Sequence, residues 1–141
     1  MKDRILSIDL GDVRTGIAVS DPLGMLANGV CTVRMTDKEK IAEMVMKYVE
    51  QFGVTKIILG YPVNMNGSIG PRAENAAQFK EILAKYTDIP VILYDERCTT
   101  IIAHTILSQS NVSSKKRKNV VDTLSAEIIL QDYLDKKNRG I

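Results

Sequence analysis

The first third of the chain predicts three short β-strands. Apolar residues dominate positions 5–10, 16–20 and 30–33, and polar or glycine-containing segments separate these runs. Gly11-Asp12 and Asp21-Pro22-Leu23-Gly24, which lie between them, are typical of tight turns. Because the connections are short, we expect the three strands to form an antiparallel meander.

The hydrophobic period then changes to that of helices alternating with buried strands. Apolar residues recur at helical spacing from Ile41 to Phe52, after a capping-box pattern at residues 36–39 and before a natural stop at Gly53. The apolar run at 56–60 is typical of a strand covered on both faces. Further along the chain we expect a helix at 72–86, a strand at 90–94, a helix near 99–107, a polar basic loop at 108–118 and a last helix from about 119 to 134.

This order of elements predicts one α/β domain over residues 1–141. Three antiparallel strands lead into a βαβαβ half, which gives a mixed five-stranded sheet flanked by helices. In open sheets of this kind, ligands bind beyond the carboxyl ends of the parallel strands. The residues that follow the strand at 5–10 and the strand at 90–94 are therefore the first place to look for a site.

Composition limits the function classes without naming one. The chain has 141 residues, 45% of them hydrophobic and 26% charged, with a net charge of +2, as expected for a soluble globular protein. No apolar run reaches the roughly 18 residues of a bilayer span, and the N-terminus lacks a signal-peptide core. We expect a cytoplasmic protein without membrane contact, in which Cys31 and Cys98 are reduced thiols rather than a disulfide or zinc ligands.

Acidic residues stand at the ends of three predicted elements. Asp9 ends the first strand, Asp95 and Glu96 end the last strand, and Asp122 opens the apolar part of the last helix. If these carboxylates converge they repel one another, and a divalent cation such as Mg²⁺ would offset that repulsion. Strand alternation allows only one of Asp95 and Glu96 to face Asp9, and the pattern does not choose between them. Taken singly, each of these acids is explained as well by a turn or by a helix start.

The last helix has a face suited to close packing against the sheet. Asp122, Ser125, Ala126 and Ile129 follow one another at helical spacing, so they share one side of the helix. Because Ser125 and Ala126 are small, the helix is expected to approach the sheet closely and to bring Asp122 near Asp9. Metal-dependent hydrolysis of phosphodiester bonds is then the leading chemistry.

Two further segments are candidates for phosphate contact. The connection from Gly60 to Arg72 is long for a strand-to-helix loop, and Asn64, Ser68 and Arg72 could meet phosphates where the next helix begins. The second segment is a run of four cations, which is either a solvated loop or a contact to a nucleic-acid backbone. Its members are Lys115, Lys116, Arg117 and Lys118.

Four segments together resemble the YqgF, or RuvX, family of the RNase H-like superfamily. They are residues 8–21, the loop at 60–73, the segment Asp95-Glu96-Arg97-Cys98-Thr99-Thr100, and residues 122–134. The likeness covers essentially the whole chain, in order. Departures are small: Tyr61 and Cys98 stand where leucine is usual, and Ser125 stands where alanine is usual.

The resemblance implies an RNase H-like fold and a nuclease. It implies a metal triad of Asp9, Glu96 and Asp122, which holds one or two Mg²⁺ or Mn²⁺ ions and selects Glu96 over Asp95. It places Arg14, Arg72 and Arg97 at basic positions suited to substrate phosphates, although Arg97 beside the triad could equally form a structural ion pair. The implied role is 5′-end processing of pre-16S rRNA in ribosome biogenesis, or else cleavage of Holliday junctions in DNA recombination and repair.

The expected partners follow from these roles. They are pre-rRNA or branched DNA, with a ribosomal component or a second copy of this chain as a protein partner. Two other classes compete with the nuclease. A nucleotide-binding ATPase would need a second domain, for which this length leaves no room, and a catalytically silent RNA-binding factor would predict a lost carboxylate.

Overall fold

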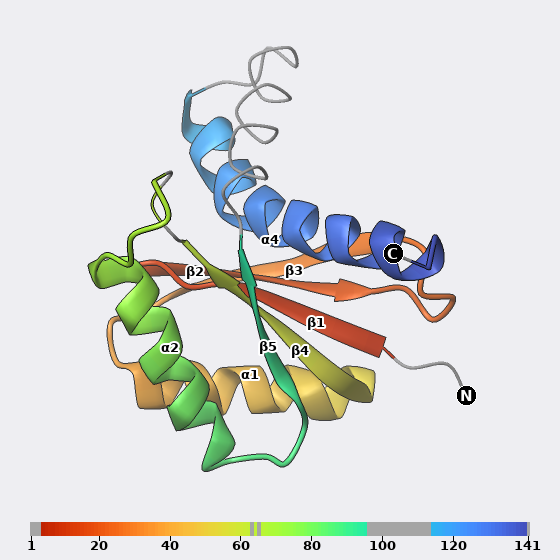
Figure 1. Cartoon of the computed structure of the whole chain (residues 1–141), viewed down its shortest axis with the longest axis horizontal. Coiled ribbons are helices and arrows are strands. Elements are labelled where there is room, and N and C mark those ends of the chain that lie inside the picture. Colours follow the sequence, from red (N-terminus) through yellow and green to blue (C-terminus); the bar gives the residue numbers. More distant parts are fainter. Residues whose placement is uncertain (1–3, 63, 65, 96–113, 141) are drawn as a thin grey trace.

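The computed structural model describes residues 4–62, 64, 66–95 and 114–140, and within this set the side chains of 114–123 are not described. It contains five strands and three helices in these ranges (Figure 1). They are β1 (Arg4–Asp9), β2 (Arg14–Ser20), β3 (Ala27–Arg34), α1 (Lys38–Phe52), β4 (Val54–Tyr61), α2 (Pro71–Ala84), β5 (Val91–Asp95) and α4 (Ser114–Asn138). The helix predicted near 99–107 lies outside the described residues.

The strands form one mixed sheet, as predicted. Its order is β3-β2-β1-β4-β5, with antiparallel pairing of β1 with β2 and of β2 with β3, and parallel pairing of β1 with β4 and of β4 with β5. The β2–β3 turn has the predicted chemistry, because Gly24 adopts a positive φ of 71° and the Asp21 carboxylate accepts hydrogen bonds from the backbone of Met25 and Leu26. Strand β4 lies between two parallel neighbours, which explains its uninterrupted apolar run.

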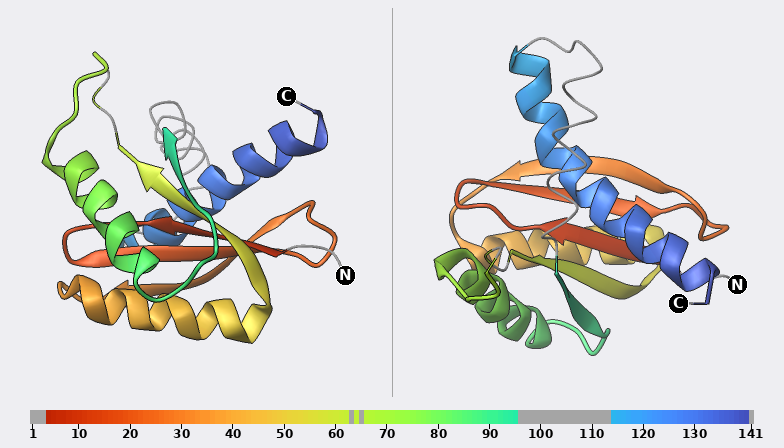
Figure 2. Two further views of the ribbon diagram at one scale, coloured as in Figure 1. Left: turned by 60° about the horizontal axis from the view of Figure 1, so that its bottom comes forward. Right: turned by 45° about the horizontal axis from the view of Figure 1, so that its top comes forward.

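Helices cover both faces of the sheet. Helices α1 and α2 lie on one face, and α4 crosses the other (Figures 1 and 2). Alternation along β1 divides the core accordingly: Leu6 and Ile8 belong to the cluster under α1 and α2, whereas Ile5 packs with Ile129 and Leu130 of α4. Consecutive residues at the end of a strand are therefore directed to different faces of the sheet.

The start of α1 differs from the predicted capping box. The N-cap is Asp37, whose carboxylate accepts from the backbone N–H groups of Glu39 (2.9 Å) and Lys40 (3.4 Å). Glu39 does not bond back to a Thr36 cap; its carboxylate instead contacts Lys85 and Tyr86, at the end of α2. The predicted stop is correct, because Gly53 closes the helix in the left-handed conformation at φ 65°.

Two other helix predictions need correction. Residues 114–118, expected in the basic loop, are helical, because α4 begins at Ser114, and the helix continues past Leu134 to Asn138. Helical spacing places Tyr86 near the side of the predicted second helix that carries Ala73, Ala76, Ala77 and Leu83, but Tyr86 is exposed, and Phe79 is buried on that side. In the part of the chain that the structure describes, no helix is both long and apolar enough to cross a membrane.

Candidate functional site

Asp9 lies at the carboxyl end of β1, on the face of the sheet that α4 covers. Ser7 and Ile5, which share its face by alternation, both contact α4: Ile5 through apolar packing and Ser7 through a hydrogen bond. The Ser7 hydroxyl donates to the backbone oxygen of Ala126 at 2.7 Å. Asp9 itself is half-buried.

Glycines flank Asp9 on both neighbouring strands. Gly16 of β2 is its direct partner in the antiparallel register. On the other side, Gly60 follows Leu59, the register partner of Ile8. Residues that are partners across a sheet point to the same face, and a glycine puts no side chain there. The sheet surface beside the Asp9 carboxylate is therefore free of neighbouring strand side chains at these two positions.

The end of β5 assigns a face of the sheet to Asp95, one of the two acidic residues between which the sequence pattern did not choose. Ile92 and Tyr94 pack with the α4 cluster, whereas Val91 and Leu93 pack with the opposite cluster. Alternation thus assigns Asp95, which is exposed and pairs in register with Tyr61, to the face opposite Asp9. Glu96 and Arg97 lie outside the described residues.

Asp122 belongs to α4, one helical turn before Ala126, but its side chain lies outside the described set, as do those of Lys115, Lys116, Arg117 and Lys118. Among the residues whose side chains are described, no three His, Cys, Asp or Glu form a group that could hold a metal ion. The described side chains do not include two of the three predicted ligands, Glu96 and Asp122. The assembly of the triad therefore stays a prediction.

Small residues bring α4 close to β1, as predicted. Ala126 is fully buried at the crossing, where its carbonyl accepts the Ser7 hydroxyl. Ser125, also expected there, is only half-buried. Close approach of a helix backbone to a strand requires a side chain no larger than these at the contact. Ala126 and Ser7 thus set the separation between α4 and the strand that carries Asp9.

A polar cluster fixes the end of β5 to α4. The Tyr94 hydroxyl donates to the Asp132 carboxylate, and Lys136 contacts both groups, at 3.0 Å from Asp132 and 3.2 Å from Tyr94. Burial raises the pKa of Asp132, but the hydrogen bonds from Tyr94 and Lys136 outweigh it and hold the pKa below its ordinary value. The pKa of Tyr94 is raised, chiefly by burial and to a lesser extent by the hydrogen bond to Asp132.

The predicted phosphate contacts are divided between the loop and the helix start. The amide of Asn64 donates to the Ser68 hydroxyl at 3.0 Å, and the hydroxyl donates to Asn66 at 2.7 Å, so both predicted side chains brace the loop. Arg72 stands in the first turn of α2, where it lines an open pocket with Lys38 and Asn75. Arg14 begins β2 opposite Arg34 and is half-buried.

Lys38 is the pocket residue that sequence reasoning missed. It follows the Asp37 cap directly, and its ammonium donates to Asn75 of α2 at 3.2 Å. In sequence it is one of many surface cations, since Lys and Arg together number 19. Only the packing of α1 beside α2 gives it a defined position.

The chain is similar to known bacterial proteins over almost its full length. The family model RuvX, described as Holliday junction resolvase, matches residues 3–136. A protein of Clostridium beijerinckii named "Putative pre-16S rRNA nuclease" is 43% identical over 136 residues, which cover 96% of this chain and 99% of that one. A protein of Listeria monocytogenes with the same name is 44% identical over 137 residues, covering 96% and 99% of the two chains.

Solved structures confirm the predicted fold. The RuvC protein of Thermus thermophilus, in complex with a Holliday junction substrate, superposes with a TM-score of 0.61 at 14% identity, covering 96% of each chain. The fowlpox virus Holliday junction resolvase superposes with a TM-score of 0.55 at 13% identity, covering 95% of this chain and 99% of that one. At such identities the likeness concerns the fold, which is RNase H-like. The family match and the full-length relatives show that this chain belongs to the RuvX (YqgF) family.

Proposed function

We propose that this chain is a divalent-metal-dependent nuclease that hydrolyses phosphodiester bonds of structured nucleic acid, acting in 5′-end processing of pre-16S rRNA in the cytoplasm. The observation that carries the proposal is the setting of Asp9. Its carboxylate stands at the carboxyl end of a central strand, between Gly16 and Gly60, on the face that α4 approaches closely. Family membership and the names of the relatives support the substrate.

The donor chemistry at Asp9 fits a hard cation. Magnesium and manganese take carboxylate oxygens and retain several waters, which requires a partly open site. Asp9 is half-buried at the carboxyl end of its strand, and the flanking Gly16 and Gly60 put no side chain beside it. In the proposal, Glu96 and Asp122 complete the ligand set for one or two ions. The alternation that directs Tyr94 to the α4 face predicts the same face for Glu96.

The residues of the chain would divide the work between holding the ions and holding the substrate. The three carboxylates bind the cations, which supply charge stabilisation at the phosphate and an activated water when bound. The hydrogen bond from Ser7 to Ala126 holds α4 close to β1, and in the proposal this closeness would let Asp122 of the helix and Asp9 of the strand share a ligand. The nucleic-acid backbone would be bound by the predicted basic residues, which are Arg14, Arg72, Arg97 and the cations at 115–118.

A cleavage assay with a matched acid control tests the proposal. End-labelled RNA spanning a pre-16S 5′ end is incubated with Mg²⁺, Mn²⁺ or EDTA. Cutting should require the metal and be lost in Asp9→Asn, Glu96→Gln and Asp122→Asn. Asp95→Asn removes a charge of the same kind on the opposite face and should leave cutting intact. Metal-dependent cutting that survives Asp9→Asn would overturn the site.

A four-way DNA junction in the same assay addresses the second candidate function. Holliday junction resolution is favoured by the description of the family and by the full-length fold similarity to RuvC. Symmetric cutting of the junction alone would exchange the order of the two substrates and would point to a second copy of the chain as partner. Binding of RNA without metal-dependent cutting of either substrate would indicate a silent assembly factor with a ribosomal partner.

A further inference from the structure

A pocket lies on the opposite side of the strand end from Asp9. Its walls come from the β1–β2 turn, the start of α1 and the start of α2, and its volume is about 70 Å³. Leu10, the residue after Asp9, lines it together with Ile41, and Leu10 belongs to the core under α1 and α2. The pocket therefore begins one residue beyond the proposed catalytic carboxylate, on the other face of the sheet.

Two cations from different helices line this pocket. Lys38 comes from the first turn of α1 and Arg72 from the first turn of α2. Lys38 donates one hydrogen bond, to the neutral side-chain oxygen of Asn75 at 3.2 Å, which leaves two further N–H groups. Within the described part of the chain, neither cation lies in an ion pair with a carboxylate.

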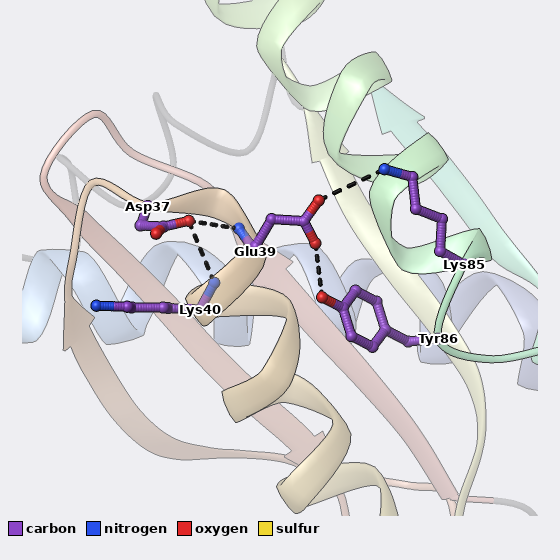
Figure 3. Close-up of polar contacts among 5 residues, drawn as sticks. All are labelled: Asp37, Glu39, Lys40, Lys85 and Tyr86. Atoms are coloured by element: carbon purple, nitrogen blue, oxygen red, sulfur yellow. Dashed lines mark hydrogen bonds and ion pairs between the residues drawn. The ribbon is translucent and has the colours of Figure 1, made fainter.

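The acidic residues next to Lys38 in sequence do not neutralise it. The Asp37 carboxylate caps α1 by accepting from the backbone of Glu39 and Lys40. The Glu39 carboxylate extends to the far end of α2, where it accepts from Tyr86 at 2.6 Å and Lys85 at 3.4 Å (Figure 3). Both carboxylates are thus engaged with other groups, and neither of them lines the pocket.

The same contacts hold the pocket in shape. The Glu39 bonds tie the start of α1 to the end of α2, and the Lys38–Asn75 bond ties it to the start of α2. Gly11 forms the third wall, where the turn approaches so closely that a Cβ would lie 2.1 Å from the backbone oxygen of Arg14. The two cations are therefore held on packed helices facing a tight turn, which is the arrangement of a preformed site.

We propose that Lys38 and Arg72 form a binding pocket for one phosphodiester of the nucleic-acid backbone. This inference rests on the proposed function, because it concerns how that substrate is held. Asp12 is the single acidic residue among the described lining residues, so two cations face one carboxylate and the net lining charge is +1. A phosphodiester carries one negative charge and matches it, whereas a terminal phosphate carries about 1.5 to 2 negative charges near pH 7.

Binding of RNA to the full chain tests the pocket separately from cleavage. The measurement uses an Asp9→Asn background with Mg²⁺ and a single-stranded RNA with a 5′-hydroxyl, titrated at several salt concentrations. The Lys38→Met/Arg72→Met variant should bind RNA roughly tenfold more weakly at 0.1 M salt. The reason is that it loses one charged, hydrogen-bonded phosphate contact, whose removal typically changes affinity by about that factor. It should also lower the slope of log K against log salt by about 0.7, the value for one phosphate contact on a single strand.

The control removes equal charge from the same two helices. Lys40→Met/Lys80→Met leaves the pocket intact, since neither residue lines it and the Lys40 side chain points away from α2 (Figure 3). It should leave the salt slope unchanged. Equal changes of affinity and salt slope in the two double variants, or RNA binding with no salt dependence, would overturn the pocket. Cleavage by the chain with and without Asp9→Asn tests the proposed nuclease activity separately from this binding measurement.

A second RNA with a 5′-phosphate identifies the source of the bound phosphate. An equal loss of affinity for both RNAs in the Lys38→Met/Arg72→Met variant assigns the pocket to a backbone diester. A loss confined to the 5′-phosphorylated RNA assigns it to a terminal phosphate and overturns the diester proposal. Thermal unfolding of each variant confirms that the protein compared is folded.

Discussion

Replacing Ala126 by leucine should displace α4 from the strand that carries Asp9. Ala126 is fully buried where the helix crosses β1, and its backbone oxygen accepts the Ser7 hydroxyl at 2.7 Å. Three added carbon atoms have no space at this contact, because protein interiors are close-packed. The helix must move outward, and Asp122, one turn away on α4, moves with it.

The expected magnitude follows from two losses. Overpacking a core position costs about 1–3 kcal/mol, and losing the buried Ser7 hydrogen bond costs about 1 kcal/mol. The free energy of unfolding should fall by about 2–4 kcal/mol, which lowers Tm by roughly 6–15 °C in a chain of this length. A displacement near 1 Å between groups that act together costs about a hundredfold in rate, so cleavage should fall by that order.

The assay pairs thermal unfolding with RNA cleavage at a temperature where every variant is folded. Leu83→Ala is the control: it empties a fully buried position on α2, under the opposite face of the sheet, at a cost of about 2–5 kcal/mol. Leu83→Ala should lose about as much stability as Ala126→Leu but should cleave RNA at the rate of the wild type. Equal cleavage rates for the two variants would refute the claim that the α4–β1 separation positions the site.

Three further predictions concern stability. A hydrogen bond to Glu39 raises the pKa of Tyr86 to about 12, so the Tyr86→Phe variant should be less stable than wild type below pH 10. The difference in Tm between the two proteins should shrink as pH rises from 10 through 12, and a constant difference would contradict this. Tyr94→Phe should lower the free energy of unfolding by about 1 kcal/mol at pH 7. Because Tyr94 and Lys136 outweigh burial and lower the pKa of Asp132, this loss should fade as pH falls below about 4, and an undiminished loss there argues against the Asp132 contact. Gly11→Ala places a Cβ 2.1 Å from a backbone oxygen, whereas a Cβ at Gly53 meets open space but sits at a φ of 65°. Chemical denaturation should therefore show a larger fall in the free energy of unfolding for Gly11→Ala than the roughly 1 kcal/mol expected for Gly53→Ala.

Local patterns were sufficient to predict most of the architecture. Alternating and continuous apolar runs identified each strand of the described residues, because the strand period and burial on one or both faces are local properties. Gly24 and Gly53 marked their turns correctly, since each supplies a positive φ. The start of α4 was placed too late: a run of lysine and arginine indicates solvent exposure, which helices and loops share.

Side-chain partners across elements could not be predicted in the same way. Glu39 fits a capping box equally well on local grounds, and only the position of α2 beside α1 gives it Lys85 and Tyr86 instead. Tyr86 has the spacing of a buried residue, but α2 ends before it and its hydroxyl turns to Glu39. These outcomes depend on how two helices pack, and hydrophobic period carries no information about that.

By itself, the sequence determined the order of the strands and helices that the structure describes, the family and the candidate acids, because periodicity, turn chemistry and motif spacing are local properties of the chain. Tertiary structure decided which face each residue occupies. It directs Asp95 away from Asp9, places glycines on both sides of Asp9, and brings Lys38 and Arg72 from separate helices to one pocket. Such relations join residues far apart in sequence, and they exist only once strand register and helix packing are fixed.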